Sequence, residues 1–217
     1  LLGVDDDGRK EAEPIRHARD GAEAHLKALH AERREVAWEE LSFDSSAVLA
    51  RFARGDTEGI YGFDSLERRQ ALRAMRPRNL EEILTLYVLT LSGPAQWFDT
   101  YLARRAGKEI PLYAHPLLVP ILSATYGLVI WQEQGVRMLR DLAGYAPGKA
   151  TYTIARLQRN TGMEAIVERD FIEGCLKNPA FVHALPDGEA HASAKAVWRT
   201  LLTHKTTLYP KSYALSR

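Results

Sequence analysis

Residues 115–145 read HPLLVPILSATYGLVIWQEQGVRMLRDLAGY, and this stretch decides the fold. Apolar residues recur at helical spacing on either side of a Tyr-Gly pair, and a short continuous apolar run follows that pair. The expected elements are, in order, a helix over 116–123, a turn at 126–127, a strand over 128–131 and a helix over 133–143. A polar Gln-Glu-Gln triplet begins directly after the apolar run.

Outward from this stretch, the sequence predicts mostly helices. Serine, aspartate and asparagine precede apolar-periodic segments as capping residues, and glycine or proline follows them. The expected helices cover 14–35, 46–53, 66–76, 80–90, 95–106, 148–159, 163–177 and 189–203, and a further short strand covers 59–63. The predicted fold class is therefore mainly α with a few short β-strands.

The composition excludes several classes of protein. The 217 residues are 46% hydrophobic and 26% charged, which is typical of a folded domain rather than a disordered chain. The net charge of +1 means that any affinity for nucleic acid must come from local patches. No apolar run approaches the ~20 residues of a transmembrane helix, so we expect no membrane partner. The single cysteine, Cys175, fits a reducing cytoplasm and a buried position on a helix.

Together with three other segments, the central stretch resembles the alpha subunit of bacterial DNA polymerase III, a C-family replicative polymerase. The similar segments are GDTEGIYGFDS at 55–65, residues 77–94, and YPKSYA at 209–214. The likeness extends over residues 47–214. It implies that residues 1–45 are the end of the palm with a connecting helix, and that residues 46–217 form the helical fingers domain. It also implies that the chain is a piece of a longer polymerase.

The same resemblance places Asp5 on a catalytic, metal-binding aspartate of the palm. Carboxylates at such a site hold the Mg²⁺ ions that phosphoryl transfer needs. An alternative interpretation from the residues alone is a solvated acidic turn, Asp5-Asp6-Asp7-Gly8, before a helix. The two other family aspartates lie on an upstream strand that this sequence does not contain, so the fragment alone is expected to be inactive.

In the fingers, the resemblance assigns a set of residues to the incoming nucleotide: Gln132, Gln134, Arg156, Lys211 and Ser212. Several neighbouring positions depart from the family pattern. Twin arginines of the family are Ile154 and Ala155 here, and a histidine is Tyr213. A glutamine of the family is Gly62, and an arginine of its Arg-Pro-Gly-Pro segment is lost. The missing arginines and histidine would supply positive charge around a triphosphate. Their loss predicts weak or absent polymerase activity unless nearby lysines and arginines compensate.

A basic segment offers a second candidate site. Arg69, Arg73 and Arg76 recur at helical spacing and share one face of the helix expected over 66–76. One interpretation is a surface that contacts the phosphates of primer–template DNA. The alternative is a solvated face whose arginines pair with three acidic neighbours, Glu67, Glu81 and Glu82.

Three functional hypotheses follow. The first is part of a DNA-directed DNA polymerase whose fingers bind dNTP and template DNA during replication or error-prone synthesis. Its partners would be primer–template DNA, dNTP, the remaining polymerase domains and other replisome subunits. The second is a catalytically degenerate paralogue that acts as a DNA-binding or assembly module. The third is a helical interaction module that has kept the likeness without the activity.

Overall fold

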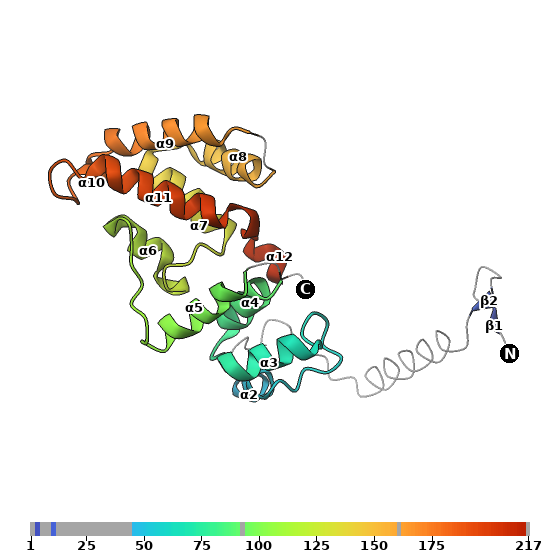
Figure 1. The fold of residues 1–217 in the computed structure, drawn as a ribbon. Helices are drawn as coiled ribbons and strands as arrows, with labels where there is room; N and C mark the ends of the chain where they lie inside the picture. The colour runs from blue at the N-terminus through green and yellow to red at the C-terminus, as the bar shows by residue number, and fades with distance from the viewer. Residues whose placement is uncertain (1–2, 5–9, 12–44, 92–93, 160–161, 216–217) are drawn as a thin grey trace. The chain divides into compact units, whose positions relative to one another are not determined.

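The computed structural model describes residues 3–4, 10–11, 45–91, 94–159 and 162–215. The chain divides into two compact units, Leu1–Ser42 and Phe43–Arg217. All the helices described below belong to the second unit, which confirms that the chain is mainly helical (Figure 1). Within the described ranges, no helix has both the length and the apolar character that crossing a membrane requires.

The first unit contributes one small antiparallel pair of strands to the described residues. β1 (Gly3–Val4) pairs with β2 (Lys10–Glu11), with Gly3 opposite Glu11 and Val4 opposite Lys10. Asp5 and the helix expected over 14–35 lie outside the described residues.

The second unit begins with helices that the sequence predicts to within one or two residues. They are α2 (Ser46–Arg54), α3 (Leu66–Met75), α4 (Leu80–Leu89) and α5 (Ala95–Arg105). The side chains of Ser65 and Asn79 cap α3 and α4 by accepting hydrogen bonds from backbone N–H groups of the first turn. Every residue of Glu82–Leu89 is buried, so α4 lies at the centre of this group.

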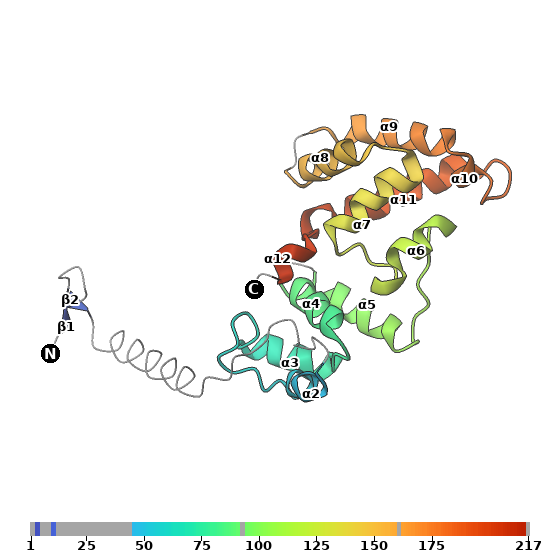
Figure 2. The same ribbon diagram turned by 180° about the vertical axis from the view of Figure 1, so that it is seen from behind.

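The remaining helices apart from α12 form a second group that packs around α11, as the opposite views in Figures 1 and 2 show. The last helix, α12, packs against α4 of the first group. The elements are η2 (Pro116–Leu118), α6 (Val119–Leu122), η3 (Ser123–Thr125), α7 (Gln132–Arg137), η4 (Met138–Leu142), α8 (Pro147–Gln158), α9 (Glu164–Lys177), α10 (Pro179–Val182), α11 (Ala190–His204), η5 (Lys205–Thr207) and α12 (Lys211–Leu215). The sequence does not predict the short helices α10 and α12. It does predict the long helices α8, α9 and α11, within one or two residues of their observed ends.

The helix expected over 133–143 changes form partway along. It begins as the α-helix α7 and widens into a π-helix, η4. The side chain of Asn178 donates to the carbonyl oxygens of Asp141 and Leu142, at 3.1 and 2.9 Å. These bonds satisfy acceptors at the end of the wide turn, where the regular helical ladder stops.

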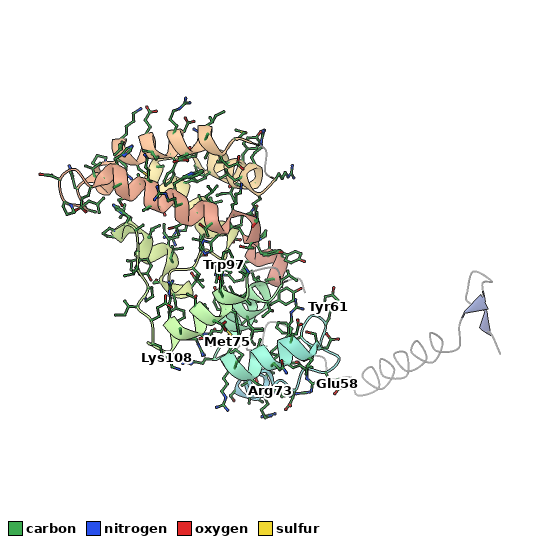
Figure 3. The ribbon with its side chains drawn as sticks, in the orientation of Figure 1. Glu58, Tyr61, Arg73, Met75, Trp97 and Lys108 are labelled. Atoms are coloured by element: carbon green, nitrogen blue, oxygen red, sulfur yellow. The ribbon has the colours of Figure 1, made fainter. Side chains whose placement is uncertain are left out.

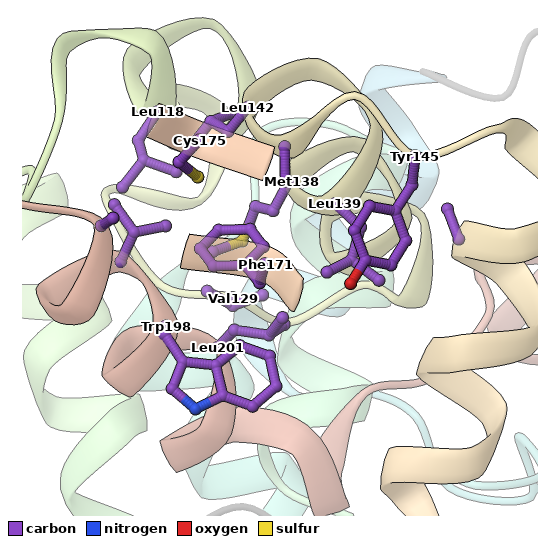
Figure 4. Close-up of a cluster of buried hydrophobic side chains, with 14 of the residues drawn as sticks. Leu118, Val129, Met138, Leu139, Leu142, Tyr145, Phe171, Cys175, Trp198 and Leu201 are labelled. Atoms are coloured by element: carbon purple, nitrogen blue, oxygen red, sulfur yellow. The ribbon is translucent and has the colours of Figure 1, made fainter. Parts of the chain in front are cut away.

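Each group of helices has its own hydrophobic core. One core contains Met138, Phe171, Cys175 and Trp198, and Figure 4 shows these side chains packed against one another. Burial raises the pKa of the Cys175 thiol to about 12, which confirms the expected inert, buried cysteine. The other core lies among α3, α4 and α5, and the fully buried Tyr101 belongs to it.

The apolar run 128–131 is buried as expected, but the predicted strand is wrong. Val129 packs in the core around Phe171, whereas Leu128, Ile130 and Trp131 pack in the core of α3–α5. The run is therefore extended, but its only bridge within the described residues is the parallel pair Trp131–Tyr209. No ladder forms because a side chain, that of Gln134, accepts the backbone hydrogen bonds of Ile130 and Trp131.

The strand predicted over 59–63 is also wrong, because this segment is a series of turns. Gly59 and Gly62 have φ angles of 75° and 76°, which an extended strand does not contain. The hydroxyl of Thr57 donates to the carbonyl oxygen of Phe63 at 2.6 Å and closes the loop. A side chain at Gly62 would meet the ring of Tyr87 at 2.9 Å, so a glutamine does not fit here without rearrangement.

A buried ion pair fixes α3, α4 and α5 to one another. The guanidinium of Arg105 binds the Glu82 carboxylate through two nitrogens, at 2.9 and 2.7 Å. It also donates to the carbonyl oxygens of Met75 and Arg76, at 2.6 and 3.1 Å. Glu82 accepts a further bond from the backbone N–H of Arg78. With side-chain exposures of 10% and 11%, Arg105 and Glu82 form a network that water reaches poorly.

Two histidines, His115 and His204, are buried. The ring of His115 stacks on Phe181, and its Nδ1 accepts a hydrogen bond from the backbone N–H of Leu117. The ring of His204 stacks on Trp97, and its Nδ1 lies 2.8 Å from the carbonyl oxygen of Thr200. Burial lowers the pKa of both histidines below the ordinary value of 6.5.

We expect the free energy of unfolding to fall as the pH drops from 7 to 5. Because the folded-state pKa of His115 and His204 is below the unfolded value, their contribution is complete above about pH 6.5. Below that pH it decreases, by at most about 1.4 kcal/mol per pH unit for each histidine, until the folded-state pKa is passed. Urea unfolding at several pH values measures this slope. His204→Gln should flatten it, while the same change at the exposed His191 should not.

Candidate nucleotide and nucleic-acid interface

The C-terminal motif lies beside the Gln-Glu-Gln triplet. The backbone N–H of Gln132 donates to the carbonyl oxygen of Tyr209 at 3.0 Å, and Tyr209 donates back to Ile130 at 3.2 Å. The Gln132 side chain donates to Gln158 of α8, and Gln158 in turn donates to the carbonyl oxygen of Leu208. Segments far apart in the sequence thus meet where the resemblance places nucleotide-facing residues.

Lys211, the first residue of α12, lies beside the contact between the triplet and Tyr209. Its ammonium forms a 2.6 Å ion pair with Glu81 and lies 5.5 Å from the centre of the Trp131 ring. The Glu133 carboxylate accepts the backbone N–H of Lys211 at 3.1 Å, which anchors the start of α12. Lys211 is about two-fifths exposed, so its ammonium remains accessible. The next residue, Ser212, is exposed.

Arg156 lies on α8, two residues before Gln158. Its guanidinium donates to the Tyr152 hydroxyl at 2.6 Å and lies 5.5 Å from the centre of that ring. Lys149, Tyr152, Arg156 and Arg159 recur every three or four residues and share one helix face, which we call the α8 cationic face. Lys149, Tyr152 and Arg159 are exposed, and Arg156 is half-buried. α8 contains no acidic residue, so nothing within the helix neutralises this face.

The register of α8 buries, fully or in part, the positions that correspond to the family's twin arginines. Ile154 is buried in the hydrophobic core, and Ala155 is half-buried. A cation at position 154 would lie in that core, which is unfavourable without a partner. The positive charge of α8 is instead carried by the α8 cationic face. Helical spacing also groups the exposed Tyr152 with this face, although the resemblance assigns it no role.

Gln134 does not lie on this surface. Its side-chain oxygen accepts the N–H groups of Ile130 and Trp131, at 2.8 and 2.9 Å. Its nitrogen donates to the hydroxyl of Thr125 at 2.7 Å and to the carbonyl oxygen of Ile121 at 3.3 Å. With only 7% exposure, Gln134 holds the turn, the apolar run and α7 together. The structure thus separates the two glutamines of the triplet, giving Gln134 an internal role.

The arginines of α3 face α2 and make backbone contacts. Arg69 donates to the carbonyl oxygen of Gly55 at 3.0 Å, and Arg73 to that of Arg54 at 2.9 Å. Arg76, at the end of α3, is exposed and has a φ of 48°. Two of the three acids expected as their partners are engaged elsewhere, because Glu81 binds Lys211 and Glu82 binds Arg105. A contact of these arginines with DNA stays a prediction.

The described residues do not form a metal site. Among them, no group of three or more histidine, cysteine, aspartate or glutamate side chains is arranged to hold a metal ion. Asp5 lies outside these residues. Catalytic and metal-binding roles of Asp5, and Mg²⁺ as the cofactor, therefore stay predictions.

Comparisons with known proteins agree on one family. Residues 20–179 match the model of the bacterial DNA polymerase III alpha subunit finger domain, a range that includes the triplet and α8 but stops before α12. The chain is 29% identical over 193 residues to the DNA polymerase III subunit alpha of Rickettsia bellii, covering 87% of this chain. It is 30% identical over 181 residues to that of Staphylococcus aureus, covering 82% of this chain. It spans about 15% of the length of these relatives. The chain therefore belongs to the family of bacterial DNA polymerase III alpha subunit finger domains.

Proposed function

We propose that this chain is the fingers region of a longer DNA-directed DNA polymerase and binds the incoming dNTP and the template strand. The α8 cationic face carries this proposal, because it presents Lys149, Arg156 and Arg159 beside an exposed tyrosine without an acidic residue in the helix. A triphosphate is stabilised by guanidinium and ammonium groups, and an exposed ring offers a stacking surface for a base or sugar.

The second part of the proposed site is the meeting point of α7, α8 and α12. Gln132 and Lys211 supply an amide and an ammonium there, and Gln158 ties this point to α8. Ser212 adds an exposed hydroxyl on α12. Lys211 forms its ion pair with Glu81 at a partly exposed position, where exchange for a phosphate costs little. These residues complete a polar surface around the α8 cationic face.

In the whole polymerase, Asp5 would contribute to binding Mg²⁺ in the palm. Mg²⁺ would neutralise charge on the triphosphate and polarise the reacting phosphate. The partners would be primer–template DNA, the other polymerase domains and further replisome subunits in the bacterial cytoplasm. These assignments are based on the family.

Primer extension by the complete polymerase tests the α8 cationic face. Arg156→Ala should raise the KM for dNTP by roughly 10- to 150-fold, the equivalent of about 1.5–3 kcal/mol for one charge-assisted contact. The matched control is Arg199→Ala, which removes an exposed arginine from α11 and should leave the KM unchanged. An equal KM in both variants would rule out this face as the dNTP site.

A second candidate function is a catalytically degenerate paralogue that binds DNA or assembles with a polymerase. The observation that favours it is the buried Ile154 at a position where the family has an arginine. The same primer-extension assay decides between the two functions. Template-dependent synthesis that disappears in Asp5→Ala would support the polymerase, and no synthesis by the unaltered protein would support the paralogue.

A further inference from the structure

A second cationic surface lies where α2 ends against α3. An open hollow of about 620 Å³ is lined by Ala50, Ala53, Arg54, Asp56, Arg73 and Arg76. We call Arg51, Arg54, Arg73 and Arg76 the α2–α3 arginine cluster, and all four side chains are exposed. Figure 3 labels Arg73 on α3. This cluster differs from the set expected from sequence, because Arg51 and Arg54 come from α2 and Arg69 is turned into the α2–α3 contact.

Two members of the arginine cluster are anchored by contacts with the backbone. Arg73 uses its Nε to bind the carbonyl oxygen of Arg54, which fixes the direction of the guanidinium while the side chain stays exposed. The backbone of Arg76 is held by the buried Arg105, which donates to its carbonyl oxygen. A preorganised guanidinium loses less conformational entropy on binding an anion than a mobile one does.

One carboxylate already lies among these arginines. Asp56 forms a 2.7 Å ion pair with Arg54. The hydrogen bond from Arg54 and the charges of Arg54, Arg51 and Arg73 lower the pKa of Asp56. A carboxylate oxygen therefore occupies a position that a phosphate oxygen could take, and the positive charges outnumber it.

We propose that the α2–α3 arginine cluster binds the phosphodiester backbone of duplex DNA and that Asp56 is a built-in competitor that weakens this binding. This inference deepens the proposed function by naming a second nucleic-acid contact, separate from the α8 cationic face. Guanidinium groups bind phosphate oxygens in a bidentate manner, and an exposed ion pair such as Arg54–Asp56 is easily exchanged. Contacts of this kind position a duplex without reading its sequence.

The test measures duplex DNA binding by the 217-residue chain, using fluorescence anisotropy across a range of salt concentrations. Arg54→Gln/Arg76→Gln should weaken binding about tenfold at low salt and reduce the slope of log K against log [salt] by about 1.8, for two lost phosphate contacts. Asp56→Asn should act in the opposite direction and strengthen binding about threefold, since it removes the competitor. Arg199→Gln, an exposed change on α11, should have no effect.

An unchanged salt slope in the double variant, with its thermal unfolding also unchanged, overturns the proposal. Weaker binding by Asp56→Asn overturns the competitor role. Polyglutamate is a further competitor in this assay. If it displaces the labelled duplex as well as unlabelled DNA of equal charge does, the cluster binds an acidic protein partner and the proposal is overturned. If the double variant keeps the salt slope of the unaltered chain while Arg156→Ala raises the KM for dNTP, only the DNA-binding cluster is refuted. If the double variant has a reduced slope while Arg156→Ala leaves the KM unchanged, only the dNTP site on α8 is refuted.

Discussion

Arg105→Met is expected to lower the free energy of unfolding by about 3–5 kcal/mol. The substitution leaves the Glu82 carboxylate buried with only the backbone N–H of Arg78 as a described partner. It also removes the donor from the carbonyl oxygens of Met75 and Arg76. An unpaired buried charge is costly because neither water nor a counter-ion replaces the lost guanidinium.

Urea unfolding provides the measurement for Arg105, and an exposed pair provides the control. Lys177 binds Glu173 with side-chain exposures of 74% and 58%, so Lys177→Met should cost far less than Arg105→Met. Replacing both Arg105 and Glu82 by methionine should recover part of the loss, because no charge then stays buried. Equal costs for Arg105→Met and Lys177→Met would show that the pair is not buried in solution.

Gln134→Leu is expected to cost about 2–4 kcal/mol of folding free energy, through two buried N–H groups left without an acceptor. These groups belong to Ile130 and Trp131, which have 3% and 1% exposure. Gln132→Leu, two residues earlier, breaks a single hydrogen bond at a partly exposed position and should cost less than about 1 kcal/mol.

The two glutamine variants also separate a structural role from a ligand-binding role. Urea unfolding should show the large loss only in Gln134→Leu, and the KM for dNTP in the complete polymerase should rise mainly in Gln132→Leu. A Gln134→Leu protein with unchanged stability and a raised KM would mean that Gln134 contacts the nucleotide, against its burial in the structure.

Local signals predicted most of the fold, and the errors have a common cause. Ser65 and Asn79 correctly predict the starts of α3 and α4, because an N-cap depends only on residues within one helical turn. The run 128–131 was misassigned because its backbone partner is a side chain, that of Gln134, rather than a neighbouring strand. The apolar residues around Gly59 and Gly62 suggest a strand, but the positive φ angles of these two glycines make turns.

The candidate site was harder to predict than the fold, for a similar reason. Helical spacing grouped Arg69 with Arg73 and Arg76, but could not show that Arg69 binds the backbone of Gly55. Nor could spacing show that Arg54, from another helix, faces the same hollow. Tertiary contacts decide which cations are available to a ligand, and a single sequence does not contain them.

The apolar run between Gly127 and Gln132 ties the length of this segment to the packing of two hydrophobic cores. Val129 enters one hydrophobic core, whereas Leu128, Ile130 and Trp131 enter the other. Substitutions that conserve apolar character and volume are therefore tolerable, but inserting or deleting one residue would move these side chains out of the cores that they fill. The length of this run is therefore expected to constrain the fold more tightly than the identity of each apolar residue does.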